Sequence, residues 1–160
     1  MNKTLVTLLI LFNFCLSYSQ RIELLKEENG FREFKLDTKI TDYDNIVQTY
    51  DEDLELTYYV VADKVFVFKQ QAYDIRLFVN KNDCLRSIEI ILIDQPNQMY
   101  PFIKEELERK YGYSEKLLIT LGNTETRYWE YEYFRLHLYY QKDEYVIIRY
   151  SKSRTYAGEY

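Results

Sequence analysis

Apolar and polar residues alternate along the last third of the chain, in three segments. The segment 134–140 places Phe134, Leu136, Leu138 and Tyr140 on one side and Arg135, His137 and Tyr139 on the other. Residues 145–151 alternate in the same way, and residues 126–131 carry Trp129 among other aromatic side chains. Because successive strand residues point to opposite faces, these patterns predict three strands, each with one face toward a core.

A hairpin is predicted in the middle of the chain, from residues 75–79 and 84–93. The four residues between them, Asn80-Lys81-Asn82-Asp83, tolerate turn conformations. In the second strand Glu89 alternates with Ile88 and Ile90, which assigns the buried face to the isoleucines. Residues 54–61 and 65–69 are rich in β-branched and aromatic side chains and predict two further strands.

One long helix is predicted over residues 97–111. Ile103, Leu107 and Tyr111 recur every four residues, which forms the apolar stripe of an amphipathic helix. Pro101 falls in the first turn, where the missing N–H costs nothing, and Gly112 follows the last residue as a helix stop.

The segments before residue 54 have shorter patterns. Residues 21–28 fit either a short strand or an irregular lead-in. Residues 31–36 alternate and predict a strand, with a bulge as an alternative because Phe31 and Phe34 fall on opposite faces. Thr41 precedes Asp42 and Asp44, and a capping residue followed by acids predicts a short helix that ends before Tyr50.

These elements predict an α+β fold, with a largely antiparallel sheet, one long helix and a short N-terminal helix. Their order suggests a duplicated β-α-β-β-β unit, although no residue-level repeat accompanies it. The length fits a single domain over residues 20–153, followed by a flexible tail over residues 154–160.

The first 19 residues predict export. Lys3 precedes an apolar run from Leu5 to Leu16, and Ser17 and Ser19 place small residues before a cleavage point at Gln20. The apolar run is shorter than the roughly 20 residues that span a bilayer as a helix. We therefore expect a secretory signal peptide, and a mature protein that is soluble in the periplasm or outside the cell.

Charge and composition narrow the possible partners. Without Lys3 the mature chain has 20 basic and 26 acidic residues, a net charge of −6. Such an acidic chain with scattered basic residues does not fit nucleic-acid binding or a basic membrane-binding patch. Cys84 is alone in the mature chain, so it is either a half-buried strand cysteine or the partner of an intermolecular disulfide. A monomer or a weak homodimer is expected.

Short motifs along the mature chain resemble a group of small exported bacterial proteins. These proteins open with a GFR-x-aromatic-K-x-G-T segment, matched by residues 30–38, except that Asp37 stands in place of the glycine. A helix that ends in KYG is matched by residues 110–112, a strand tryptophan by Trp129, and an R-x-x-L-x-Y strand by residues 135–140. The resemblance implies an exported α+β domain of unknown function, with no catalytic residues to carry over.

The sequence contains no motif that specifies a reaction, a metal or a cofactor. His137 is the only histidine, which fits poorly with a Ser–His–Asp triad or a zinc site built from several histidines. A Cys84–His137 pair lacks the local context of known cysteine nucleophiles. The acidic run at residues 51–53 lacks the spacing of a calcium loop and reads as a solvated loop. We predict no catalytic residue, no metal and no cofactor.

Aromatic residues are the strongest remaining feature, with 18 tyrosines and nine phenylalanines in 160 residues. Some of these rings must face away from the core, where they either stabilise the sheet or bind a partner. We expect a non-enzymatic exported domain that binds a protein or a cell-envelope ligand. The residues expected at this surface are Tyr131, Tyr133, Arg135, His137 and Tyr139. The alternative is an envelope hydrolase that uses paired carboxylates.

Overall fold

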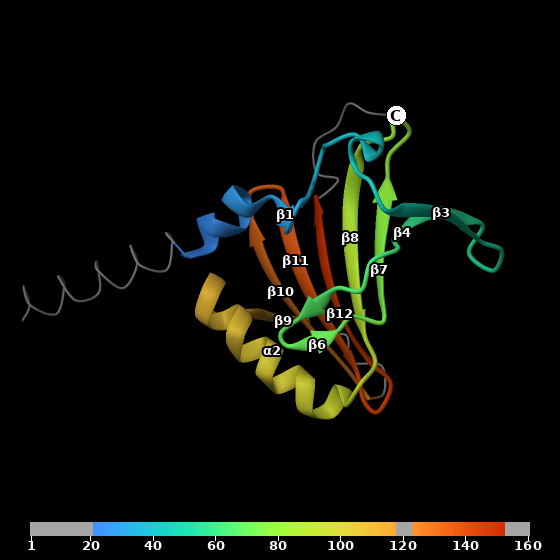
Figure 1. The fold of residues 1–160 in the computed structure, drawn as a ribbon. Helices are drawn as coiled ribbons and strands as arrows, with labels where there is room; N and C mark the ends of the chain where they lie inside the picture. Colours follow the sequence, from blue (N-terminus) through green and yellow to red (C-terminus); the bar gives the residue numbers. More distant parts are fainter. Residues whose placement is uncertain (1–20, 118–122, 153–160) are drawn as a thin grey trace, which may run out of the picture.

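The computed structural model describes residues 21–117 and 123–152 and consists mainly of one eight-stranded antiparallel sheet (Figure 1). The strand order is β3-β4-β7-β8-β12-β11-β10-β9. The bounds are Ile46–Asp51 for β3, Leu56–Val61 for β4, Asp74–Val79 for β7, Leu85–Leu92 for β8, Glu115–Leu117 for β9, Thr124–Tyr131 for β10, Phe134–Gln141 for β11 and Tyr145–Lys152 for β12. This architecture confirms the predicted α+β class and the hairpin of β7 and β8. The predicted signal peptide and the tail over residues 154–160 lie outside the described residues.

The sheet consists of two four-stranded meanders that meet where β8 pairs with β12. A helix over residues 21–28 precedes the first meander, and α2 (Pro96–Tyr111) precedes the second. Each half therefore has a helix upstream of its four sheet strands, and two further two-stranded hairpins lie within the first half. The predicted β-α-β-β-β unit is wrong, because the helix of the first half lies upstream of all its strands.

Two predictions near the N-terminus are wrong. Residues 21–28 are helical, with Leu25 buried and Ile22 packed against the core at helical spacing. The helix predicted from Thr41 is only a 3-10 turn, η1 (Ile40–Asp42), and the following residues form β3. The acids after Thr41 mimic a helix start, but the β-branched residues Ile46, Val47 and Thr49 favour pairing with β4.

Two segments that the sequence predicts as single strands belong to tight two-stranded hairpins. Residues 31–36 divide into β1 (Gly30–Phe31) and β2 (Phe34–Lys35), and residues 65–69 contribute β5 (Phe66–Val67), which pairs with β6 (Gln70–Gln71). Gly30 has a φ of 135°, and a Cβ there would lie 2.2 Å from the carbonyl oxygen of Phe34, so only glycine fits. Asp37 has a φ of 69°, the left-handed conformation for which glycine is usually preferred.

The core lies between the sheet and α2, on the side where the helix of residues 21–28 and both hairpins also pack (Figure 1). Ile103, Leu107 and Trp129 are all at most 2% exposed and belong to this one core. The indole Nε1 of Trp129 donates a hydrogen bond of 2.8 Å to the carbonyl of Gly112, just after the helix end. None of the helices in the described ranges has the length and apolar content needed to cross a bilayer.

Candidate functional site

The sheet face opposite α2 carries a row of polar and aromatic side chains. Register pairs Arg76 with Glu89, Glu89 with Arg149, Arg149 with His137, and His137 with Tyr128. These five residues, each on a different strand, form what we call the polar row. Among the residues that the structure describes, no helix packs on this face, because the buried side chains of both helices cluster with the opposite face.

Ion pairing and cation–π contacts hold the polar row together. The guanidinium of Arg149 contacts the carboxylate of Glu89 and lies 5.3 Å from the centre of the Tyr139 ring. Glu89 is only 6% exposed, so its charge is compensated where water has little access. Arg76 pairs with Asp74 at 2.8 Å and lies 5.1 Å from the centre of the Tyr58 ring. The surface is therefore preorganised.

His137 is at the centre of this surface and is uncharged near neutral pH. Its Nδ1 lies 2.5 Å from the hydroxyl of Tyr139, and its ring is flanked by those of Tyr139 and Tyr128. Burial and, to a lesser extent, the positive charges of Arg149 and Arg135 together lower the pKa of His137 from 6.5 to about 4. The imidazole thus acts as a neutral polar group.

The structure brings together three of the five predicted site residues. Arg135, His137 and Tyr139 share the face of the polar row, as the alternation on β11 predicts. Tyr131 lies on the other face, where its hydroxyl is 3.3 Å from Glu23 in the helix of residues 21–28. Tyr133 lies in the β10–β11 turn beneath the ammonium of Lys152. On β10 Tyr131 falls on the same side as the buried Trp129, and Tyr133 lies in a turn where period-two alternation does not apply.

The sequence does not reveal the other partners in the polar row. Arg76, Glu89 and Arg149 are separated from His137 by 12 to 61 positions, and only the strand order makes them neighbours. Alternation shows that each faces away from the isoleucine core. The pairing of β8 with β12, which connects the two meanders, has no local signal.

The described residues considered for catalysis or metal binding do not come together in the structure. Cys84 lies at the β7–β8 turn, and β8 is separated from the strand of His137 by β12, so the two residues do not form a thiol–imidazole pair. Residues 52–55 form the exposed β3–β4 turn, while Glu130 pairs with Arg135 and Glu132 with Lys26. In the described ranges, no cluster of three histidine, cysteine or acidic residues could hold a metal ion.

Comparison with known proteins does not assign the chain to a family. No family model matches the chain, and no match is found among curated proteins or solved structures. The resemblance to small exported bacterial proteins therefore stays a prediction.

Proposed function

We propose that this protein is an exported, non-enzymatic binding domain of the cell envelope that uses the face of the polar row to bind a protein or another envelope ligand. The observation that carries the proposal is the continuous row of arginine, glutamate, histidine and tyrosine side chains across five strands, on a face where no described helix packs. Arginine and tyrosine are enriched where proteins bind one another.

The shape of this face favours a protein over a small molecule. A row across five adjacent strands, which are spaced about 4.8 Å apart, extends roughly 20 Å. A small ligand prefers a concave cavity, whereas a protein partner covers a broad surface with a few buried anchors. Tyr139 is a suitable anchor because its ring is held between Arg149 and His137 before any partner arrives.

The alternative, a carboxylate-based hydrolase, receives less support from the arrangement of acids. A glycosidase needs two carboxyl groups facing one substrate cavity, about 5 to 9.5 Å apart. Asp74, Glu89 and Glu130 lie on the face of the polar row, and each pairs with an arginine. A carboxylate held in an ion pair with arginine is less available to act as an acid, a base or a nucleophile.

The binding proposal is tested by capture from envelope extract, with Tyr139→Ala compared with Tyr113→Ala. Tyr113 is 78% exposed just after α2, so the control makes the same substitution away from the polar row. Chemical crosslinking followed by mass spectrometry identifies the partner and the contact site. We expect Tyr139→Ala alone to lose the partner while the domain stays folded. Equal capture by both variants would remove this face from the proposal.

Export is tested separately, by sequencing the N-terminus of protein recovered from its native host. Cleavage after Ser19 should give a chain that starts at Gln20, with pyroglutamate as its cyclised form. Protein that still begins at Met1 would end the export proposal without affecting the binding assignment.

A further inference from the structure

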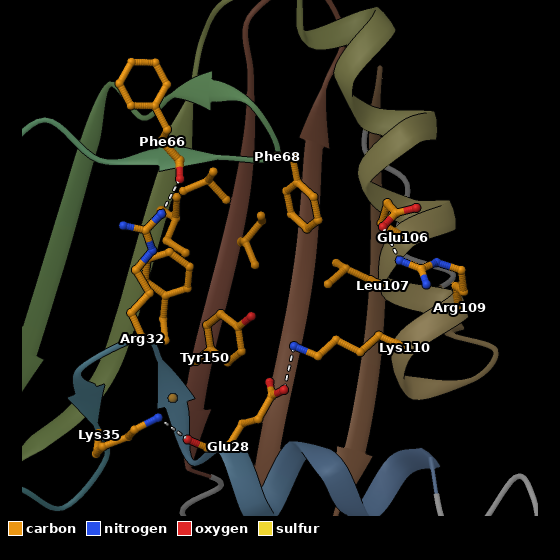
Figure 2. A pocket seen from close by; sticks show the side chains of 15 residues that line it. Glu28, Arg32, Lys35, Phe66, Phe68, Glu106, Leu107, Arg109, Lys110 and Tyr150 are labelled. Atoms are coloured by element: carbon orange, nitrogen blue, oxygen red, sulfur yellow. Dashed lines mark hydrogen bonds and ion pairs between the residues drawn. The ribbon is translucent and has the colours of Figure 1, made fainter.

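A groove of about 750 Å³ lies on the opposite side of the sheet from the polar row (Figure 2). Four segments enclose it: the end of the helix over residues 21–28, the β1–β2 hairpin, the β5–β6 hairpin and the last turns of α2. Its volume is in the range of about 300–1,000 Å³ that is usual for small-ligand sites. No element contributes more than a few of its residues, so no local motif predicts it.

The floor of the groove is apolar. Ile90, Ile148, Leu107 and Val67 line its base, and the half-buried rings of Phe31 and Phe68 supply the apolar surface open to a ligand. The ring of Phe68 extends into the groove from the turn of the β5–β6 hairpin (Figure 2). A peptide lying on this floor would leave its N–H and C=O groups without partners, whereas a hydrocarbon chain would not. The floor therefore favours an aliphatic ligand.

The rim carries more positive than negative charge. Four cations, Arg32, Lys35, Arg109 and Lys110, face two acids, Glu28 and Glu106. Both acids are already engaged: Arg109 pairs with Glu106 and Lys110 with Glu28, each at 2.6 Å.

The other two cations, Arg32 and Lys35, bind main-chain carbonyls. Arg32 donates to the carbonyl of Phe66 at 2.5 Å, and Lys35 to that of Glu28 at 2.7 Å. A carbonyl satisfies a donor but does not neutralise its charge. These two side chains therefore leave an excess of two positive charges beside the apolar floor.

A buried hydroxyl network holds the charged end of the groove in place. The hydroxyl of Tyr111 donates to the carboxylate of Glu28, which also receives the ammonium of Lys110. Burial raises the pKa values of Tyr111 and Tyr150, so both hydroxyls stay protonated. Glu28 is thus fixed by two donors, and it does not need to turn toward Lys35.

We propose that the groove binds a single-chain amphiphile with a carboxylate head, of the chemical class of long-chain fatty acids. The head lies along the edge of the groove formed by the β1–β2 hairpin, beside the excess charge of Arg32 and Lys35, and the chain extends toward Phe68 and Leu107. This site is independent of the protein-binding face, because the two lie on opposite sides of the sheet.

Titration calorimetry below the micellar concentration tests this proposal with three ligands that share a twelve-carbon chain. Dodecanoate carries a carboxylate, dodecyltrimethylammonium a positive charge, and dodecyl maltoside no charge. We expect saturable one-to-one binding of dodecanoate, and binding of the other two that is weaker by at least about tenfold, as the loss of charge-assisted contacts implies. Equal affinity for all three would overturn the assignment of the head, and no saturable binding would overturn the site.

Variants separate the groove from other cationic positions. The double variant Arg32→Gln, Lys35→Gln should weaken dodecanoate binding by at least about tenfold. Its control, Lys81→Gln with Lys142→Gln, makes the same charge change at two exposed turn positions and should bind normally. Circular dichroism checks that both variants are folded. If the two double variants bind alike, the attraction is only the net charge of the protein, and the proposal fails.

Backbone amide NMR locates the ligand and keeps this proposal distinct from the proposed function. Dodecanoate should shift backbone amide signals of residues 30–35, 66–71 and 106–110, and leave the side-chain imidazole signal of His137 unchanged. Tyr139→Ala should bind dodecanoate normally even if it loses its protein partner. Shifts confined to β11 and β12 on the polar-row side would overturn the groove assignment.

Discussion

The two faces of the sheet are built from the same strands but have different chemistry. On β8, Ile88 and Ile90 are fully buried on the core face of the sheet, while Glu89 between them points to the polar row. The covered face excludes water with close-packed apolar side chains, which supply most of the folding free energy. The other face depends on matched charges and ring contacts. One strand can therefore serve stability and recognition together, because its side chains alternate.

Burial on the polar-row face has a different origin. Glu89 is 6% exposed and the neighbouring Ile91 is 8% exposed, although their face lacks a described helix. Long side chains such as Arg149, Arg76 and Tyr139 lie over them instead. This cover persists only while its charges are paired, whereas the cover from α2 depends on apolar packing alone. Substitutions on the two faces should therefore differ in size and in pH dependence.

The largest effect is expected on the covered face, for Leu107→Ala. Leu107 is 2% exposed on the core side of α2, so truncation leaves a cavity and should lower the free energy of unfolding by about 2–5 kcal/mol. Leu54→Ala is the matched control, because Leu54 is 67% exposed and should change it by less than about 0.5 kcal/mol. Urea denaturation measures both values. Similar values for the two variants would contradict the packing of α2 described above.

On the polar-row face, Arg149→Ala should have the next largest effect, about 1–3 kcal/mol. The change leaves the carboxylate of Glu89 buried without its main cation, and the partial exposure of Arg149 keeps the cost below that of a fully buried pair. Arg135→Ala is the control, because the Arg135–Glu130 pair is exposed by about a third on each side and contributes little. Equal losses in thermal or urea melts would show that Glu89 does not depend on Arg149.

A pH-dependent contribution of about 1–2 kcal/mol is expected from His137. Its pKa is about 4 in the folded protein and 6.5 in the unfolded chain, so between these values the unfolded chain binds more protons. The stabilisation is complete above pH 6.5 and is lost as the pH falls toward 4. We expect a contribution of only about 1–2 kcal/mol because the imidazole ring is partly exposed to solvent.

The control for this titration is His137→Gln, which should remove this part of the pH profile and leave the contribution of the carboxylates. Because His137 is the only histidine, one imidazole NMR signal reports its pKa directly. A titration midpoint near 6.5 in the folded protein would contradict the burial that we describe.

The sequence predicts the elements whose hydrophobic period is long. The α2 stripe of Ile103, Leu107 and Tyr111 and the alternation of β11 and β12 are confirmed because their apolar faces drive packing. Residues 41–51 show the opposite case: Asp42 and Asp44 mimic a helix start, and the decisive influence is the β4 partner. Short segments follow their tertiary neighbours, and a single sequence does not display those neighbours.

Only part of the candidate site can be predicted from the sequence. Alternation identifies which residues of β11 face away from the core, and the structure confirms that Arg135, His137 and Tyr139 share that face. Alternation does not predict that Glu89 and Arg149 lie beside these residues, because β8 and β12 become neighbours only where the two meanders meet. The groove depends on four separate segments and is visible only in the folded chain.

The smallest expected effects are at Tyr139, where two substitutions separate the ring from its hydroxyl. Tyr139→Phe keeps the ring beside Arg149 and His137, and should cost less than about 1 kcal/mol through the lost hydroxyl contact. Because burial and the two arginines account for the lowered pKa of His137, this variant should leave that pKa near 4.

Tyr139→Ala removes the half-buried ring, should cost about 1 kcal/mol, and should admit water that raises the pKa of His137 toward 6.5. NMR titration of the imidazole, together with thermal melts, measures both effects on the same samples. An unchanged pKa in Tyr139→Ala would mean that other side chains shield His137, and Tyr139 would then be neither the cover of the polar row nor a preorganised anchor for a partner.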